Sequence, residues 1–173
     1  TLKASSADTY DTMPIRVRPE GLSPEDTVRY IAKKKCDAAA ALCAPDDLII
    51  TADTMVFLDN DRLGKPHDED DALRMLRELA GRGHTVCTGV SVRCGETSEL
   101  FAVSTRVFFR PMTDDEIRAY IKTGEPMDKA GAYGVQSRGA LFVERIDGDF
   151  FNVMGLPVEQ LGLVLARFGV KLL

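Results

Sequence analysis

The spacing of apolar and polar residues predicts a helix near the start of the chain. Ser23-Pro24-Glu25-Asp26 is typical of a helix start: serine accepts hydrogen bonds from free N–H groups, proline suits the first turn, and acids favour the positive end of the dipole. An apolar face then recurs at helical spacing, formed by Val28, Ile31, Ala32, Cys36 and Ala39. The pattern predicts that one side of this helix packs against a core.

A nearly continuous apolar run follows at Leu48–Phe57, LIITADTMVF. Its β-branched composition predicts a strand covered on both faces. Asp53 lies in the middle of this strand, and a carboxylate there costs free energy unless it is paired, hydrogen-bonded or bound to metal. Two interpretations stay open: a core aspartate satisfied by nearby backbone, or a functional carboxylate.

Turn and cap signals divide the rest of the chain into further elements. The pattern predicts an extended arm or short strand over 1–22, a turn over 58–66, helices over 68–80, 113–124 and 158–168, and strands over 84–95 and 98–111. Lys65 precedes Pro66, which holds it at the edge of the turn. Helices interleaved with strands and hairpins indicate an α/β fold with a mixed sheet.

The longest unusual stretch is residues 128–157, DKAGAYGVQSRGALFVERIDGDFFNVMGLP. Five glycines alternate there with charged and amide side chains, among them Lys129, Gln136 and Asp149. Glycines allow positive φ or a close approach of the backbone to another group, which suits a site for an anionic, polar small molecule. The alternative is a set of tight turns that join short strands.

Composition narrows the class of protein. The 173 residues fit one domain, or two lobes that share a core, and 45% hydrophobic with 28% charged residues is ordinary for a globular protein. A net charge of −5 argues against a nucleic-acid-binding surface. The four cysteines lack zinc-site spacing and indicate free thiols in a reducing compartment. No apolar run approaches the length of a membrane span, so we expect a cytoplasmic protein without membrane partners.

Three segments resemble one family. ITADTMVFLDNDRLGKP resembles the "ADT…GKP" block of the Maf proteins, and HTVCTGVSV resembles the strand that follows it there. The 128–157 stretch resembles the longest signature of the family almost residue for residue. Long blocks in the same order are far more specific than a single glycine motif. The likeness extends over nearly the whole chain from Glu25 onwards.

The resemblance implies a single Maf-like domain over residues 1–173. Its fold would be inosine-triphosphatase-like, with an elongated mixed sheet, flanking helices and two lobes around a cleft, often as a homodimer. It also implies a house-cleaning enzyme that hydrolyses a nucleoside triphosphate to the monophosphate and pyrophosphate with a divalent metal ion, Mg²⁺ or Mn²⁺. Asp53-Thr54 and the Tyr133–Gln136 tetrapeptide resemble the branch that acts on dTTP, UTP and modified uridine nucleotides.

The resemblance also implies roles for particular residues. Asp53 matches the proton acceptor and a metal contact, and Asp149 a further metal or water contact. The remaining matches concern substrate: Lys35, Lys65 and Lys129 for phosphate, Thr54 for shaping the site, and Gln136 for the nucleobase. A carboxamide can donate and accept at once, which suits the edge of uracil or thymine.

The chain departs from the family at its beginning. The family opens with a strand and a phosphate-binding loop of the form "LASxSPRRxxLL", whereas TLKASSADTY resembles the segment after that loop. The SxSPRR loop is thus absent from the sequence as given, and two interpretations stay open: a truncated form of an enzyme that has the loop, or a real variant without it. In the second case the alternative is a non-catalytic nucleotide-binding protein or a regulator of cell division.

Overall fold

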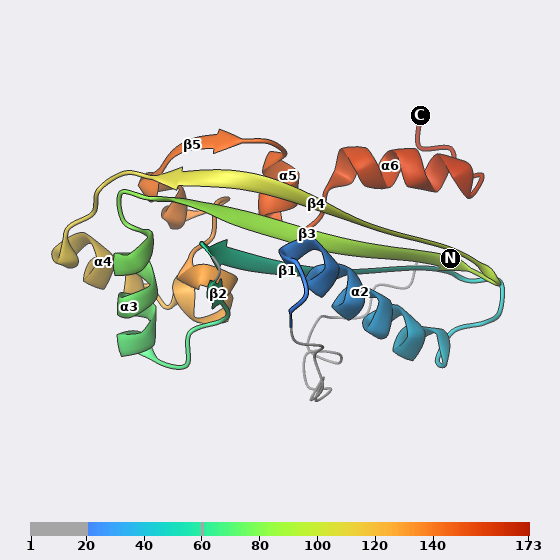
Figure 1. The fold of residues 1–173 in the computed structure, drawn as a ribbon, viewed down its shortest axis with the longest axis horizontal. Helices are drawn as coiled ribbons and strands as arrows, with labels where there is room; N and C mark the ends of the chain where they lie inside the picture. The colour runs from blue at the N-terminus through green and yellow to red at the C-terminus, as the bar shows by residue number, and fades with distance from the viewer. Residues whose placement is uncertain (1–20, 60) are drawn as a thin grey trace. The chain divides into compact units, whose positions relative to one another are not determined.

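The computed structural model describes residues 21–59 and 61–173, which form one five-stranded sheet with helices packed on it (Figure 1). The predicted arm at 1–22 lies almost entirely outside these residues. The elements are α2 (Pro24–Ala40), β1 (Leu48–Leu58), β2 (Asp61–Leu63), α3 (Glu69–Leu79), β3 (Gly83–Cys94), β4 (Thr97–Phe109), α4 (Asp114–Ile121), β5 (Val143–Asp147), α5 (Phe150–Met154) and α6 (Val158–Arg167). Three short 3₁₀ helices lie between α4 and β5: η1 (Glu125–Asp128), η2 (Ala130–Ala132) and η3 (Arg138–Phe142).

The α/β class is confirmed, but the expected mixed sheet is wrong: neighbouring strands, in the order β2-β1-β3-β4-β5, run antiparallel. β1 and β2 form a hairpin in which Val56 pairs with Leu63, and β3 and β4 form a second hairpin around Gly95. Helix α3 connects β2 with β3, but β1 lies between these two strands in the sheet. The helical crossover therefore joins strands that are not neighbours and creates no parallel pair.

The N-cap signals place the starts of α2 and α4 where the sequence predicts them, whereas α4 ends at Ile121, before the predicted end at Gly124. Ser23 accepts a hydrogen bond from the backbone N–H of Asp26 at the start of α2. Thr113 and Glu116 form a reciprocal capping box at the start of α4. Each cap satisfies N–H groups that the helix itself leaves without partners.

The chain divides into two compact units. The boundary between them crosses three strands: β1 after Asp53, β3 after Thr88 and β4 after Ala102. Among the described residues, the first unit comprises 21–53, Gly89–Ala102 and Val158–Leu173. The second comprises Thr54–Thr88 and Val103–Pro157.

In the first unit, α2 and α6 cover opposite faces of the strands. Thr51 Oγ1 donates to the Ala32 carbonyl of α2 at 2.7 Å. The neighbouring positions in the strands face α6, where the apolar cluster contains Val90, Val92, Leu161, Val164 and Leu165, with Leu48, Ile50 and Ala52 packed against it. Successive side chains of a β-strand point to opposite faces of the sheet, so alternate residues face α2 and α6. The first seven residues of β1 are only partly buried, so the predicted complete cover applies to its last four.

The second unit holds the larger core. The leucines of α3, the end of β1 and the aromatic residues of β4 and the 3₁₀ segment pack together there, and α3 and α4 lie side by side (Figure 1). His84, Phe109 and Tyr133 form a buried edge-to-face cluster in this core. Within the predicted turn at 58–66, the structure adds the short strand β2, because residues 61–63 pair with the end of β1.

Among the helices of residues 21–59 and 61–173, none combines the length and the apolar character that crossing a membrane would require.

Candidate active site

Asp53 and Lys35 form an ion pair in the first unit. Asp53 is in β1, Lys35 is in α2, and the Lys35 ammonium lies 2.8 Å from Asp53 Oδ1. The side chains are only 15% and 18% exposed, respectively, so solvent screens their attraction less than on an open surface. Lys35 Nζ also lies 3.4 Å from the Ala52 carbonyl. The lone carboxylate of the apolar strand thus stands beside a cation that sequence spacing alone did not connect with it.

The close contact between α2 and β3 keeps the helix that carries Lys35 close to the sheet. A Cβ at Gly89 of β3 would lie 2.3 Å from the backbone carbon of Val28. Only glycine permits this approach of strand to helix. The Lys35–Asp53 distance therefore depends on backbone packing as well as on charge.

Thr54 directs its side chain into a hydroxyl network of the second unit. Its Oγ1 lies 2.9 Å from Thr88 Oγ1, and Thr88 donates to the Asn152 carbonyl at 3.0 Å. Thr54 Oγ1 also lies 3.4 Å from the Gly155 carbonyl, which it can reach as a donor. The Thr54 hydroxyl is thus engaged with neighbouring protein groups, and its part in shaping a substrate site stays a prediction.

Lys65 and Lys129 both lie near the Asp128 carboxylate in the second unit. Lys129 Nζ is 2.6 Å from Asp128 Oδ1 and donates to the Glu125 carbonyl at 3.1 Å. The hydrogen bond from Lys129, and then the charges of Lys129 and Lys65, lower the pKa of Asp128. An anionic group therefore already lies within the field of both predicted phosphate lysines.

Gln136 lies in an exposed turn between Gly134 and η3. Tyr133, two residues after the positive-φ Gly131, is buried and pairs with His84 Nε2 at 2.8 Å. The turn thus begins at Tyr133, whose ring is buried in the core, and it places Gln136 at the surface. Burial lowers the pKa of His84 to about 4 and raises that of Tyr133, so both are neutral near pH 7.

Asp149 serves a local structural purpose in this structure. Its Oδ1 accepts a hydrogen bond from the Phe151 N–H at 2.7 Å and caps α5. Within 21–59 and 61–173, no group of three or more His, Cys, Asp or Glu side chains is arranged to hold a metal ion. Carboxylate oxygen is the donor type that Mg²⁺ prefers, so Asp53 and Asp149 both fit a metal by their chemistry. One oxygen of each is already engaged, Asp53 Oδ1 with Lys35 and Asp149 Oδ1 with the Phe151 N–H.

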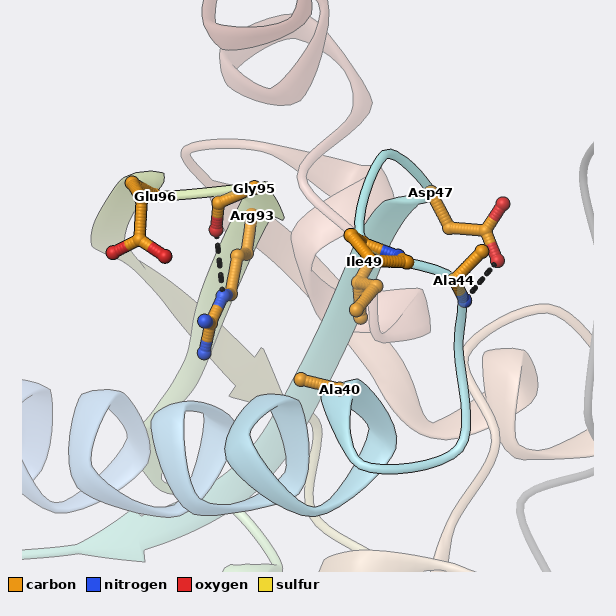
Figure 2. Close-up of a pocket in the computed structure, with 8 residues that line it drawn as sticks. Ala40, Ala44, Asp47, Ile49, Arg93, Gly95 and Glu96 are labelled. Carbon is orange, nitrogen blue, oxygen red and sulfur yellow. Dashed lines mark hydrogen bonds between the residues drawn. The ribbon is translucent and has the colours of Figure 1, made fainter.

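A separate hollow of about 130 Å³ lies in the first unit near the β3–β4 hairpin (Figure 2). Its polar groups bond locally: Arg93 Nε donates to the Gly95 carbonyl, and the Ala44 N–H donates to Asp47. Among the described residues that line it, none is a predicted site residue. We assign it no part in the reaction.

Sequence reasoning missed Glu125, a half-buried carboxylate between Gly124 and Pro126. Burial raises its pKa, but hydrogen bonds from Ser137 and Tyr120 outweigh that effect, so its pKa is lowered overall. No periodic or motif signal connects Glu125 with a serine twelve residues later. The connection arises only when the 3₁₀ turns fold back on α4.

Comparison with known proteins places this sequence in a family. The family model described as "Maf-like protein" matches residues 2–168. A protein of Bacillus velezensis named dTTP/UTP pyrophosphatase is 50% identical over 150 residues, which cover 87% of this chain and 79% of that protein. Proteins of the same name from Bacillus pumilus and Dictyoglomus turgidum are 44% and 48% identical, over 93% and 89% of this chain and 86% and 80% of their own lengths. The chain therefore belongs to the Maf-like protein family.

Proposed function

We propose that this protein hydrolyses dTTP, UTP and related or modified nucleotides to the monophosphate and pyrophosphate. The structural observation that carries the proposal is the Asp53 carboxylate held 2.8 Å from the Lys35 ammonium in a largely buried position. Similar proteins bearing the name dTTP/UTP pyrophosphatase support the substrate class.

Asp53 is the proposed proton acceptor. Water forms a bond to phosphorus while the bond from phosphorus to the bridging oxygen breaks, and pyrophosphate leaves with that electron pair. The water gives up a proton, which the Asp53 carboxylate takes. A positioned base of this kind contributes on the order of 10²- to 10⁴-fold to a rate.

The three lysines supply positive charge for the phosphates. An ammonium has three N–H donors, so Lys35 can contact Asp53 and a phosphate oxygen together. Lys65 and Lys129 lie by Asp128 in the described state, and a bound phosphate would compete with that carboxylate for them. Cations are most effective where negative charge develops in the transition state.

A divalent ion, Mg²⁺ or Mn²⁺, is part of the proposal. Mg²⁺ is commonly held by one or two carboxylates together with substrate phosphates, and Asp53 is the residue we assign to it. When bound, such an ion would neutralise phosphate charge. Asp149 is the second candidate: its Oδ1 accepts from the Phe151 N–H, and its other carboxylate oxygen is the one we propose for the ion.

Gln136 is the proposed contact to the nucleobase. Uracil and thymine present a carbonyl, an N–H and a second carbonyl in a row, and one carboxamide can pair with two of these groups. The exposed turn leaves the Gln136 side chain at the surface, accessible to a ligand.

Two broader expectations belong to the same proposal. We place the protein in the cytoplasm, where its nucleotide substrates are. We also propose a homodimer, for which the exposed apolar side chains Phe150, Phe151 and Met154 offer a surface that a second copy could cover. Sedimentation at several protein concentrations tests the dimer.

The test of the proposed function is pyrophosphate release from a panel of dTTP, UTP, GTP and 7-methyl-GTP with Mg²⁺. We expect dTTP and UTP to be the best substrates. A protein that turns over 7-methyl-GTP best contradicts the branch assignment. Binding of dTTP without turnover supports the non-catalytic alternative instead.

A further inference from the structure

The Glu125 side chain gathers hydrogen-bond donors from two separate segments. Its Oε1 accepts from Tyr120 Oη of α4 at 2.7 Å and from Ser137 Oγ at 2.5 Å. The backbone N–H groups of Gly139 and Arg138 donate to Oε1 and Oε2, each at 3.3 Å. One half-buried carboxylate therefore accepts four hydrogen bonds, three of them from the residues directly after Gln136.

The residues before Gln136 are attached to the same network. The Gly134 N–H donates to Tyr120 Oη at 3.1 Å, and that hydroxyl donates to Glu125. A Cβ at Gly139 would lie 2.7 Å from the Gly134 carbonyl and 2.9 Å from Tyr120 Oη, so the two ends of the turn nearly touch. The turn that carries Gln136 is thus held at both ends by Tyr120 and Glu125.

The same network reaches one of the proposed phosphate lysines. Lys129 Nζ donates to the Glu125 backbone carbonyl, and the stem of Lys129 crosses Gly134, where a Cβ would lie 2.9 Å from Lys129 Cε. The residue that holds the nucleobase turn is therefore also a neighbour of the phosphate lysine.

We propose that Glu125 is a positioning residue that fixes the Gln136 turn and thereby sets the preference for uracil and thymine nucleotides. The proposal rests on the proposed function. An ionised carboxylate suits the position, because it is an acceptor only and can serve four donors on its two oxygens. A glutamine would turn an NH₂ group toward donors and leave some of them without an acceptor, at a site where such losses are costly.

The first experiment compares Glu125→Gln with Glu144→Gln, which changes an exposed glutamate of β5. We expect Glu125→Gln to lower the ratio of kcat/KM for dTTP over GTP about tenfold, which corresponds to a loss of about 1.4 kcal/mol. The change should appear mainly in the KM for dTTP, with kcat within about threefold, because Asp53 is untouched. Glu144→Gln should change neither constant. An equal loss for dTTP and GTP, or an unchanged ratio, overturns the proposal.

A second measurement separates positioning from general support of the fold. If Glu125 acts through Gln136, the double variant Glu125→Gln/Gln136→Ala should be no less selective than Gln136→Ala alone, whereas independent roles predict additive losses. Additive losses overturn the proposal. If Glu125→Gln does not fold, Ser137→Ala is the second variant, because it removes one of the four donors. It should lower the ratio of kcat/KM for dTTP over GTP as well. An unchanged ratio in Ser137→Ala would count against the proposal.

Two readouts do not require turnover. Exchange of the Arg138 and Gly139 amide hydrogens should become at least about tenfold faster in Glu125→Gln, because their acceptor is weakened. Nucleotide binding in an Asp53→Asn background should show the same loss of dTTP preference. If the unaltered protein binds dTTP selectively but releases no pyrophosphate, the proposed function fails while this proposal is still tested by binding. Unchanged exchange and an unchanged binding ratio overturn it.

Discussion

At the scale of single residues, the pairing of Asp53 with Lys35 is the feature on which the proposed chemistry depends. Asp53 could be singled out from sequence because a carboxylate interrupts an apolar strand. Its cation could not be identified in that way, since the second residue lies on α2, eighteen positions earlier, and the contact depends on how closely the helix approaches the sheet. A polar residue in an apolar strand can thus be recognised from the sequence as a candidate site residue. The residue that pairs with it can be recognised only from the folded structure.

Replacement of Asp53 by Asn should abolish most turnover while the protein stays folded. The amide has nearly the same shape but cannot take the proton, so we expect pyrophosphate release to fall on the order of 10²-fold or more. Asp37→Asn is the matched control, because Asp37 is a more exposed aspartate paired with Lys33 on α2. Near-normal release by a folded Asp53→Asn protein would refute the assignment of the base.

Other residues show which features of the structure can be predicted from local sequence patterns and which cannot. The five apolar positions predicted for the face of α2 are all buried, because helical periodicity alone determines that face. The roles of Glu125 and Asp128 depend on contacts made by 3₁₀ turns, which have no periodic signal. The glycine-rich stretch indicated a site, but the hydrogen bonds that shape it became visible only in three dimensions.

At the scale of elements, the contact between α2 and β3 organises the first unit. The sequence predicts both elements, since caps and apolar runs are local signals. It did not predict the antiparallel order, because that order depends on β1 lying between the two strands that α3 connects. It also missed β2, a three-residue strand defined by its pairing with β1 rather than by its own composition.

Two glycine-to-alanine substitutions should therefore have opposite effects on stability. Gly89→Ala would place a methyl group 2.3 Å from the Val28 backbone, so we expect a loss of about 3 kcal/mol or more in the free energy of unfolding. Gly162→Ala lies within α6, where the added Cβ meets Leu172 Cδ1 at an ordinary 3.5 Å, and the better helix former should add up to about 1 kcal/mol. Denaturant unfolding of both variants checks the pair, and equal stabilities would argue against the close packing of α2 on β3.

At the scale of the whole molecule, a neutral histidine in the core links stability to pH. Burial lowers the pKa of His84 to about 4 in the folded protein, against about 6.5 when the chain is unfolded. Above pH 6.5 both states are neutral at this position and nothing is lost. As the pH falls from 6.5 toward 4, the unfolded chain binds a proton that the folded protein does not, so stability decreases.

The expected loss from His84 between pH 7 and pH 5 is about 2 kcal/mol in the free energy of unfolding. His84→Gln should remove that part of the pH dependence, whatever it does to stability at pH 7. His67→Gln should keep it, since His67 is exposed. The check is urea unfolding at half-unit pH steps, and an unchanged slope in His84→Gln would contradict the assignment to His84.

In the proposed reaction, the α–β anhydride of a pyrimidine nucleoside triphosphate is split with Asp53 as the base. The most direct measurement is identification of the products from dTTP and Mg²⁺ by phosphorus NMR, with the unaltered protein and with Asp53→Asn in parallel. We expect dTMP and pyrophosphate from the unaltered protein and almost no product from the variant. Formation of dTDP and inorganic phosphate, or equal product from both proteins, would contradict the proposal.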